Sequence, residues 1–305
     1  MSLSQIKQYA MRILLGKDNY TKYSMDQWYK KISTQNPGLI KRVKENINFK
    51  DIHKDKRCFI LGNGPSLKEQ DLSLLKDEYV FTVNQIAKHK DFDKLKTNYH
   101  FWADPTFFKL DKDKPEDMQL LETMLNVKTG ENNPVCFFAS DAYDFVNEFE
   151  LDKKLDIKFY VFHQSITDHM NEKIDFTKLV PGFHTVVQYA IWMAIYMGFS
   201  EIYILGCETT SILTSVNVRL NENLDNDYAY EISEKEKKRM LNRTNVVSFE
   251  DELFSFYHVV KDYRLIYEYC KKNSIHIANC TPGGLIESFP RKKYEHVIGG
   301  KYSNE

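Results

Sequence analysis

The chain has 305 residues, of which 42% are hydrophobic and 14% aromatic, so it can build a large core and is not an intrinsically disordered protein. Lys and Arg (42) nearly balance Asp and Glu (43), leaving a formal charge of −1 and no overall basic surface for nucleic acid. The five cysteines are scattered without a CxxC pair. We therefore expect buried thiols in a reducing compartment and no zinc site.

Residues 1–52 are predicted to form a helical N-terminal extension. Residues 2–15 have the pattern of an amphipathic helix, with Lys7 and Arg12 inside the apolar stretch, which is not typical of a signal peptide. This helix is expected to pack on the main domain or on a partner subunit of a homo-oligomer, with peripheral membrane contact as the alternative. The longest apolar stretch, Val186–Met197, is too short to cross a bilayer, so we expect a cytoplasmic protein.

From Arg57 onward, short apolar runs alternate with helical patterns. Strands are predicted at residues 58–61, 79–83, 99–103, 134–139, 158–162, 201–205 and 275–279, and the main helices at 185–197 and 249–273. Strands that are apolar throughout and separated by helices indicate a parallel sheet covered on both faces. The prediction is an α/β fold with a doubly wound, mostly parallel Rossmann-like sheet over residues 53–290. A loop or lid is expected within 209–247, and residues 291–305 form a basic tail.

The first strand is followed by a glycine-rich turn, Gly62-Asn63-Gly64-Pro65, after which Ser66 opens a helical pattern. Glycines let the backbone approach a ligand closely, and Ser66 could cap the helix. A helix N-terminus suits a phosphate. A Gly-x-Gly by itself is equally typical of an ordinary tight turn, but a strand before it and strand–helix alternation after it favour a nucleotide-binding turn.

Polar residues stand directly after several of the predicted strands. Ligands of such sheets bind beyond the carboxyl ends of the strands, so these residues are expected to meet at one edge. They are Asn63, Asn84, Asp104, Glu208 and Thr281.

Five segments in order resemble those of bacterial sialyltransferases that use CMP-activated sugars. The same segments resemble the motility-accessory flagellin glycosyltransferases and the group that contains an archaeal hydroxymethylpterin diphosphokinase. They are GNGPSL, VNQI, ADPTFF, HTVVQYAIWMAIYMGFSEIYILGCE and NCTPGG, and together they cover about residues 57–290. The resemblance implies a GT-A-like variant of the Rossmann sheet. The chain departs from the family pattern at Asp104, where the family has Asn, at Thr210 in place of Tyr, and at Phe183 in place of Arg.

The resemblance also implies an activity and a set of site residues. The donor would be a CMP-activated acidic nonulosonic sugar, and the acceptor a glycan, glycolipid or protein. Transfer would invert the anomeric centre without a metal or other cofactor. Thr210 and Tyr228 would assist the phosphate, and His258, at a helix start, would be the general base. The nucleotide would be held by Gly62, Asn63, Gly64, Ser66, Asn84, Asp104, Thr185, Glu208, Thr281 and Gly283.

Other interpretations remain open at this stage. A Mg²⁺/ATP-dependent diphosphokinase on the same scaffold would place the metal on Asp104 and Glu208. A non-catalytic glycan-assembly module would have no use for His258, which would then be a surface or capping histidine. His184 is either structural or a substrate contact. The basic stretch 291–293 is either a solvated face or a contact for anionic lipid.

Overall fold

A computed structural model shows the fold of the chain. It describes residues 10–11, 13–130, 132–163, 174–220, 228–234, 236–238, 241 and 247–299. Most of the predicted amphipathic helix at residues 2–15 and parts of the predicted lid lie outside the described residues.

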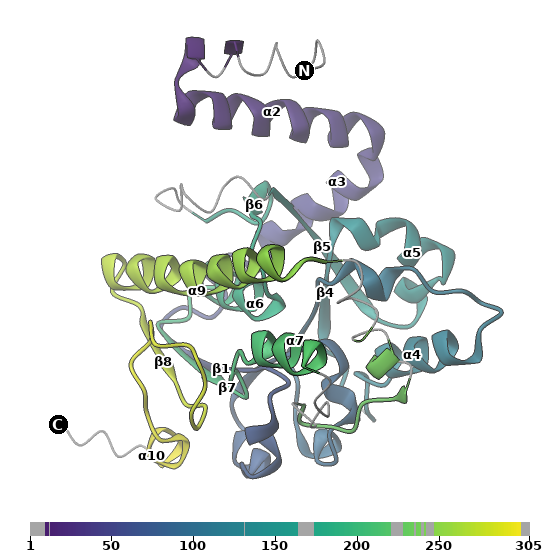
Figure 1. Ribbon diagram of the computed structural model, residues 1–305, viewed down its shortest axis with the longest axis vertical. Helices are drawn as coiled ribbons and strands as arrows, with labels where there is room; N and C mark the ends of the chain where they lie inside the picture. Colours follow the sequence, from purple (N-terminus) through teal and green to yellow (C-terminus); the bar gives the residue numbers. More distant parts are fainter. Residues whose placement is uncertain are drawn as a thin grey trace.

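One sheet of eight parallel strands forms the centre of the molecule (Figure 1). The strand order is β6-β5-β4-β3-β2-β1-β7-β8, so the direction of winding reverses between β1 and β7. This confirms the predicted doubly wound α/β fold. The strands are β1 (Arg57–Leu61), β2 (Tyr79–Val83), β3 (Tyr99–Trp102), β4 (Val135–Ala139), β5 (Asp156–His163), β6 (Leu179–Pro181), β7 (Glu201–Leu205) and β8 (His276–Asn279).

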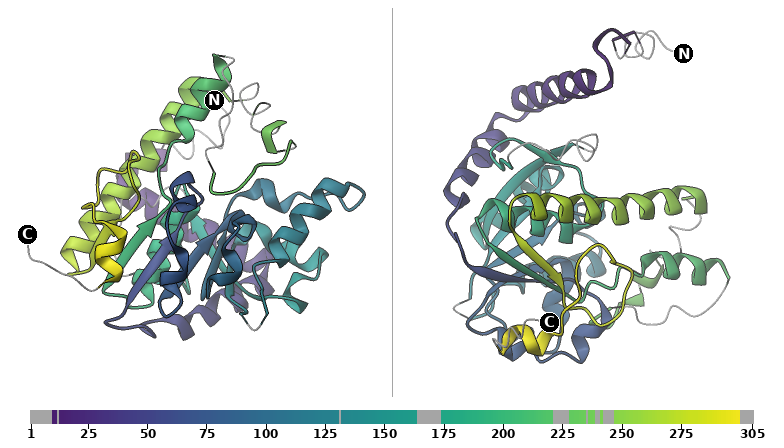
Figure 2. Two further views of the ribbon diagram at one scale, coloured as in Figure 1. Left: turned by 90° about the horizontal axis from the view of Figure 1, so that it is seen from below. Right: turned by 90° about the vertical axis from the view of Figure 1, so that its left-hand side faces the viewer.

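Helices cover the sheet and project beyond it. The α-helices are α2 (Lys17–Gln35), α3 (Pro37–Lys44), α4 (Pro115–Leu125), α5 (Tyr143–Glu148), α6 (Val186–Tyr196), α7 (Ser211–Arg219), α9 (Phe249–Lys272) and α10 (Tyr294–Ile298). Helix α6 packs along β1, β2 and β3, and α9 packs on α6 and β8. Ten of the eleven residues of α6 are buried, which explains why its sequence is apolar on all sides. Helices α7 and α9 run side by side past the edge of the sheet (Figure 2).

The structure differs from the sequence-based prediction after the glycine turn. The predicted α-helix is instead two short 3₁₀ helices, η2 (Pro65–Lys68) and η3 (Leu72–Leu75), and Ser66 lies inside η2 rather than capping a helix. The side chain of Asp71 caps the N-terminus of η3. Strand β6 was not predicted, and residues 211–219 form α7 where a loop was expected.

The terminal segments are partly built into the core. Leu39, Ile40 and Val43 of α3 are buried, and α3 contacts β5, whereas α2 projects away from the sheet (Figures 1 and 2). At the other end, Tyr294 of α10 is buried against Phe59 of β1. The compact domain therefore extends beyond the predicted limits of 53 and 290 on both sides.

Arg291 contributes to the fold of the C-terminal segment. Its guanidinium donates hydrogen bonds to the carbonyl oxygens of Thr281, Gly283, Gly284 and Ile286, so it fastens the loop after β8 although the residue is exposed. None of the helices in the described part of the chain is long and apolar enough to cross a bilayer.

Candidate functional site

The loops after β1 and β7 lie against each other at the switch point of the sheet. Gly62 N–H donates to the Leu205 carbonyl (2.8 Å) and Gly64 N–H to the Gly206 carbonyl (2.8 Å). The backbone N–H of Ser66 donates to Oε1 of Glu208 (2.7 Å). Three backbone N–H groups of the turn are therefore hydrogen-bonded within the protein itself. Phosphate binding by this turn, which the sequence favoured, stays a prediction.

The glycines of the turn allow this close packing of loop on loop. A Cβ atom at Gly62 would lie 2.3 Å from the Gly206 carbonyl oxygen, and one at Gly64 would lie 1.5 Å from Oε2 of Glu208. Gly283, by contrast, has no heavy atom within 4 Å of its Cβ position and needs its glycine for a φ of +71°. The glycines at 62 and 64 thus serve contact between two parts of the chain, and their part in ligand binding stays a prediction.

Asn63 and Asn84 lie side by side after the neighbouring strands β1 and β2. Nδ2 of Asn63 donates to the carbonyl oxygen of Val83 (3.2 Å), and Asn84 adopts a left-handed backbone with φ of 49°. Asn tolerates this conformation better than most residues. The structure therefore brings these two predicted site residues together.

Four buried polar atoms surround this turn without a hydrogen-bond partner among the described residues. They are Oδ1 of Asn63, Oγ of Ser66, Oδ1 of Asn84 and Oε2 of Glu208. A buried polar atom left unpaired costs about 1–3 kcal/mol, so such atoms point to a ligand or ordered water. All four are oxygens that can accept a hydrogen bond, and three of them can only accept.

Thr281 and Glu208 lie at the same edge, after β8 and β7. The hydroxyl of Thr281 accepts from the Cys207 N–H (3.0 Å), and the Leu285 N–H donates to the Glu208 carbonyl (2.8 Å). Thr281 is buried, so its hydroxyl joins the two loops. Burial raises the pKa of the Cys207 thiol, which is consistent with an inert, structural cysteine.

A segment of the predicted lid crosses this edge. The N–H of Ala229 donates to the Asn63 carbonyl (2.8 Å), which places the stacked rings of Tyr228 and Tyr230 next to the turn. Further along, the carboxylate of Glu236 pairs with Lys88 (3.0 Å).

The Glu236 carboxylate also accepts from the backbone N–H of Ser233 (3.0 Å) and from the side chain of Gln85. Although burial acts in the opposite direction, the hydrogen bonds from Ser233 and Lys88 lower the pKa of Glu236. The carboxylate is therefore held in its charged form, and it fastens the lid segment to the loop after β2.

Thr210 directly precedes α7, the α-helix that follows β7 in the chain. No side chain in the described residues caps the N-terminus of α7, and Thr210 is half-buried there. The positive end of a helix and its unpaired N–H groups suit an anion. The N-terminus of α7 is therefore a candidate anion site.

A pair of histidines lies between the start of α6 and the middle of α9. The rings of His184 and His258 are stacked with centroids 5.0 Å apart and planes 20° apart. Nδ1 of His184 lies 2.8 Å from Oδ2 of the buried Asp262. His258 is the tenth of the 24 residues of α9, so the expectation that it starts a helix is wrong.

Thr185 has a structural role at the start of α6. Its side chain and that of Gln188 form a capping box, and its hydroxyl lies 3.3 Å from the Tyr263 hydroxyl. Burial raises the pKa of Tyr263, which is therefore a neutral phenol. Nucleotide binding by Thr185 stays a prediction, because the observed contacts of its hydroxyl are to the protein.

Asp104 stands apart from the switch point. Its Oδ1 accepts from the N–H (2.9 Å) and hydroxyl (2.7 Å) of Thr106, the arrangement of a turn-forming residue. In the sheet, β3 and β7 are separated by three strand-to-strand spacings. At about 4.8 Å for each spacing, the two strands lie roughly 14 Å apart. Asp104 and Glu208 are therefore too far apart to bind one Mg²⁺ ion together. Among the described residues, no three His, Cys, Asp or Glu side chains cluster as a metal site would require.

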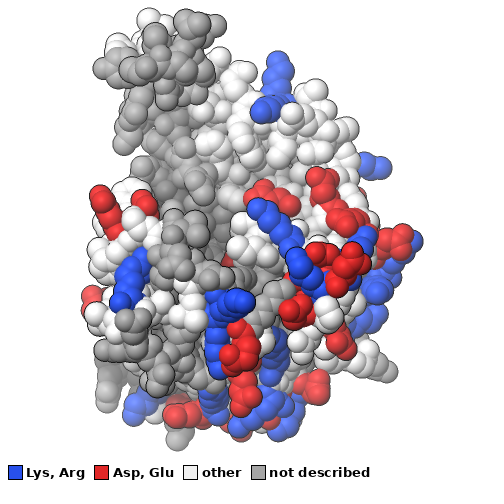
Figure 3. All heavy atoms as spheres, turned by 45° about the vertical axis from the view of Figure 1, so that its right-hand side comes forward, with Lys and Arg blue, Asp and Glu red and all other residues white. Residues whose placement is uncertain are grey.

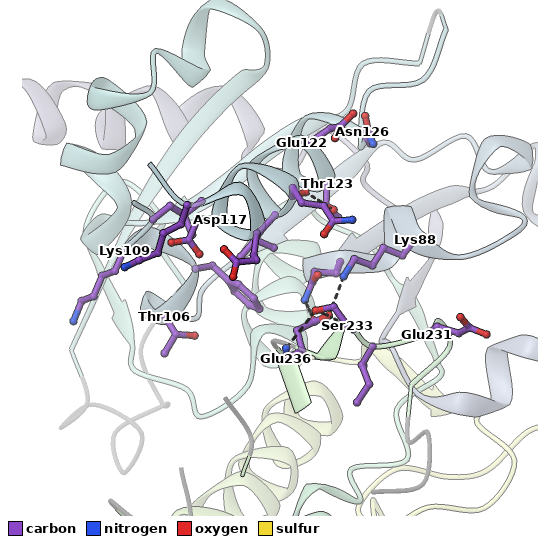
Figure 4. A pocket seen from close by; sticks show the side chains of 18 residues that line it. Lys88, Thr106, Lys109, Asp117, Glu122, Thr123, Asn126, Glu231, Ser233 and Glu236 are labelled. Carbon is purple, nitrogen blue, oxygen red and sulfur yellow. Dashed lines mark hydrogen bonds and ion pairs between the residues drawn. The ribbon is translucent and has the colours of Figure 1, made fainter. Parts of the chain in front are cut away.

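An open pocket of ≈ 960 Å³ lies beside this edge, between α4, the loops after β2 and β3, and residues 231–233 and 236 (Figure 4). Lys88 and Glu236 point toward each other at its wall, and Asp117 and Thr123 of α4 line it. The lining holds three lysines and five carboxylates. On the face shown in Figure 3, side chains of both signs are interspersed.

Sequence reasoning missed Asp262, Tyr263 and Glu236. The sequence does hold a signal for Asp262, because this residue follows His258 by four positions and so lies on the same face of the helix. The T-x-x-Q pattern of 185–188 also predicts a capping box. The contact between Glu236 and Gln85 joins residues 151 positions apart and carries no local signal.

One comparison, that with a family model, agrees with the resemblance to the hydroxymethylpterin diphosphokinase group. No curated protein matches this chain at a significant level. One similar solved structure is that of the MAf glycosyltransferase from Magnetospirillum magneticum AMB-1, with 13% sequence identity and a TM-score of 0.44. The match covers 84% of this chain and 38% of that protein, so this chain spans well under half of its length. The family model described as "6-hydroxymethylpterin diphosphokinase MptE-like" matches residues 38–211, more than half of the chain. The chain therefore belongs to the MptE-like family.

Proposed function

We propose that the protein is a glycosyltransferase that takes an acidic nonulosonic sugar from a CMP donor and transfers it, with inversion, to a hydroxyl of a glycan, glycolipid or protein. The observation that carries this proposal is the group of four unpaired acceptor oxygens around the first turn, on Asn63, Ser66, Asn84 and Glu208.

The chemistry of these oxygens favours a nucleoside over a phosphate. Ribose hydroxyls and the cytosine amino group are donors that would satisfy them, whereas phosphate oxygens are acceptors. The carboxylate of Glu208 would in addition repel a phosphate placed beside it. We therefore place the nucleoside, rather than the phosphate, between the loops after β1, β2 and β7.

The phosphate would then lie toward the N-terminus of α7. Thr210 has a hydroxyl at this helix end, and Tyr228 lies next to Asn63 through the Ala229–Asn63 hydrogen bond. Two hydroxyl donors and a helix N-terminus can stabilise the charge that develops on the leaving phosphate without a metal. A direct displacement of CMP then inverts the anomeric centre.

An imidazole of the stacked pair would remove the proton of the acceptor hydroxyl. The sequence assigned this role to His258, and the structure adds His184 at 5.0 Å between ring centroids. Histidine is suited to accept a proton near neutral pH.

We further propose that the pocket beside α4 receives the acceptor. Its amides, carboxylates and lysines suit the many hydroxyls of a sugar, with Phe107 as an apolar surface. Because the lining has two more carboxylates than lysines, it favours neutral or amine-bearing acceptors over anionic ones.

A diphosphokinase is the second candidate, and the description of the MptE-like family favours it. Transfer of a diphosphate from ATP would call for magnesium held by carboxylates. Asp104 and Glu208 follow strands β3 and β7, which are three strand spacings or roughly 14 Å apart, and this argues against the metal site expected from the sequence.

Thermal-shift titration separates the two candidates. CMP is expected to raise the melting temperature in the presence of EDTA, and ATP with Mg²⁺ is expected to have little effect. Stabilisation by ATP only when Mg²⁺ is present would support the diphosphokinase instead.

A further inference from the structure

Three side-chain contacts join the start of α6 to the middle of α9. Nε2 of Gln188 donates to the Val259 carbonyl (2.9 Å), and the Thr185 hydroxyl lies 3.3 Å from that of Tyr263. The third contact is between Nδ1 of His184 and Oδ2 of Asp262 (2.8 Å). The first two contacts join the two helices without a charged group.

Asp262 is costly to bury. It is 0% exposed, and its second oxygen, Oδ1, has no hydrogen-bond partner among the described residues. A buried carboxylate contributes little to stability even when it is paired, because it loses its hydration. A buried carboxylate on a partly exposed histidine is, however, a common way to orient an imidazole.

The hydrogen bond to Asp262 selects one tautomer of His184. When Nδ1 carries the proton and donates it to the carboxylate, Nε2 is left as an acceptor. The His184 side chain keeps 23% of its surface exposed although its partner carboxylate is fully buried. Nε2 lies at the opposite end of the ring from that buried carboxylate and is the nitrogen left to accept a proton.

We propose that His184 is the residue of the histidine pair that takes the acceptor proton, and that Asp262 is its positioning residue. This inference rests on the proposed function. The acceptor O–H proton moves to Nε2 of His184 as the acceptor oxygen bonds to the anomeric carbon of the donor. The bond between that carbon and the phosphate oxygen breaks, and CMP leaves with the electron pair. The resulting imidazolium stays paired with Asp262, and His258 stacks on its ring.

The test compares Asp262→Asn, His184→Gln and His258→Gln in the full chain, with CMP-N-acetylneuraminic acid as the donor probe. Glu252→Gln is the matched control, since Glu252 is a second buried carboxylate of α9 and pairs with Arg219. Release of CMP from the probe and its binding are measured separately. Asp262→Asn and His184→Gln should each lower the turnover rate at least 100-fold and change the dissociation constant for CMP less than threefold. The turnover rate should fall less in His258→Gln than in His184→Gln, and the control variant should keep the wild-type rate.

A second measurement does not depend on activity or on the stability of a variant. Nitrogen chemical shifts of the His184 ring in the wild-type protein report its tautomer, and we expect the proton on Nδ1. A proton on Nε2, or an Asp262→Asn rate equal to that of the control, would overturn the inference. A larger fall in turnover rate in His258→Gln than in His184→Gln would also overturn the inference, while leaving the proposed function intact. The proposed function fails separately, if the wild-type protein does not bind CMP.

Discussion

The carboxylate of Glu208 lies against Gly64, so that a methyl group added at Gly64 would stand 1.5 Å from Oε2. The same carboxylate accepts the Ser66 N–H through Oε1 (2.7 Å). The loop after β7 therefore occupies the side of the glycine turn where the sequence predicted a phosphate. This contact moves the expected phosphate position from the glycine turn to the N-terminus of α7.

Gly64→Ala should destabilise the protein as well as weaken nucleotide binding. The new methyl group would meet the Gly206 carbonyl oxygen at 2.7 Å, and that backbone has little room to move. We expect a loss of about 1–3 kcal/mol in the free energy of unfolding, measured by urea denaturation. Gly38→Ala is the control, because its close neighbour is only the hydroxyl end of Tyr143. An unchanged stability of Gly64→Ala would show that the two loops are not packed in this way.

Asn84→Gly should separate binding from stability. Asn84 has a φ of 49°, which glycine adopts without strain, and its Oδ1 has no partner among the described residues. The substitution should leave the melting temperature within a few degrees of the wild type. The dissociation constant for CMP should rise about tenfold or more, since one hydrogen bond is worth roughly 1.4 kcal/mol. Isothermal titration calorimetry would measure it, and an unchanged affinity would remove Asn84 from the site.

Glu236→Ala should release the lid segment from the loop after β2. The variant loses the ion pair with Lys88 and the hydrogen bonds from Ser233 and Gln85. Hydrogen exchange of the Ala229 amide, which donates to Asn63, should become faster. Glu234→Ala is the control, because the Glu234 side chain is 88% exposed and its ion pair with Lys237 contributes little. Equal exchange in both variants would mean that Glu236 does not hold the segment.

His100 should make the fold sensitive to acid. Burial lowers its pKa to about 3, and Nδ1 lies 2.8 Å from the Thr82 hydroxyl. In the unfolded chain the pKa is about 6.5, so below that pH the unfolded state binds a proton that the folded state does not. The contribution of His100 to the free energy of unfolding should therefore be constant above pH 6.5. Below that pH it should fall by about 1.4 kcal/mol per pH unit.

The measurement for His100 is the free energy of unfolding at pH 7 and pH 5, in the wild type and in His100→Gln. The variant should have the smaller difference between the two pH values, by about 2 kcal/mol. An equal difference in both proteins would show that His100 is protonated in the fold. The cavity that the substitution creates lowers the free energy of unfolding equally at both pH values, so its effect cancels when the two pH differences are compared.

The strands of this fold could be predicted because each is a short apolar run with helical patterns between. Of the five polar residues predicted to meet at one edge, Asn63, Asn84, Glu208 and Thr281 follow the strands around the switch point, whereas Asp104 follows β3 and stands apart. Strand β6 has only three residues, Leu179–Pro181, which is too short for a periodic signal. Helix α7 was missed because it opens a long polar and charged stretch and none of its residues is buried.

The contacts of the site could not be predicted, because they join distant positions. Whether Gly64 faces a ligand or Glu208 depends on how the loop after β7 folds back, and nothing local to the turn determines it. Likewise, Asp262 acquires its partner only when α9 packs on the start of α6, 78 positions away in sequence.

The central claim is that the edge between β1, β2 and β7 binds a cytidine nucleotide without a metal. Isothermal titration calorimetry of the full chain with CMP in EDTA tests it most directly, with Asn84→Gly alongside. We predict saturable binding of CMP by the wild type and at least tenfold weaker binding by the variant. Binding of ATP with Mg²⁺ but not of CMP, or equal CMP binding by both proteins, would contradict the account.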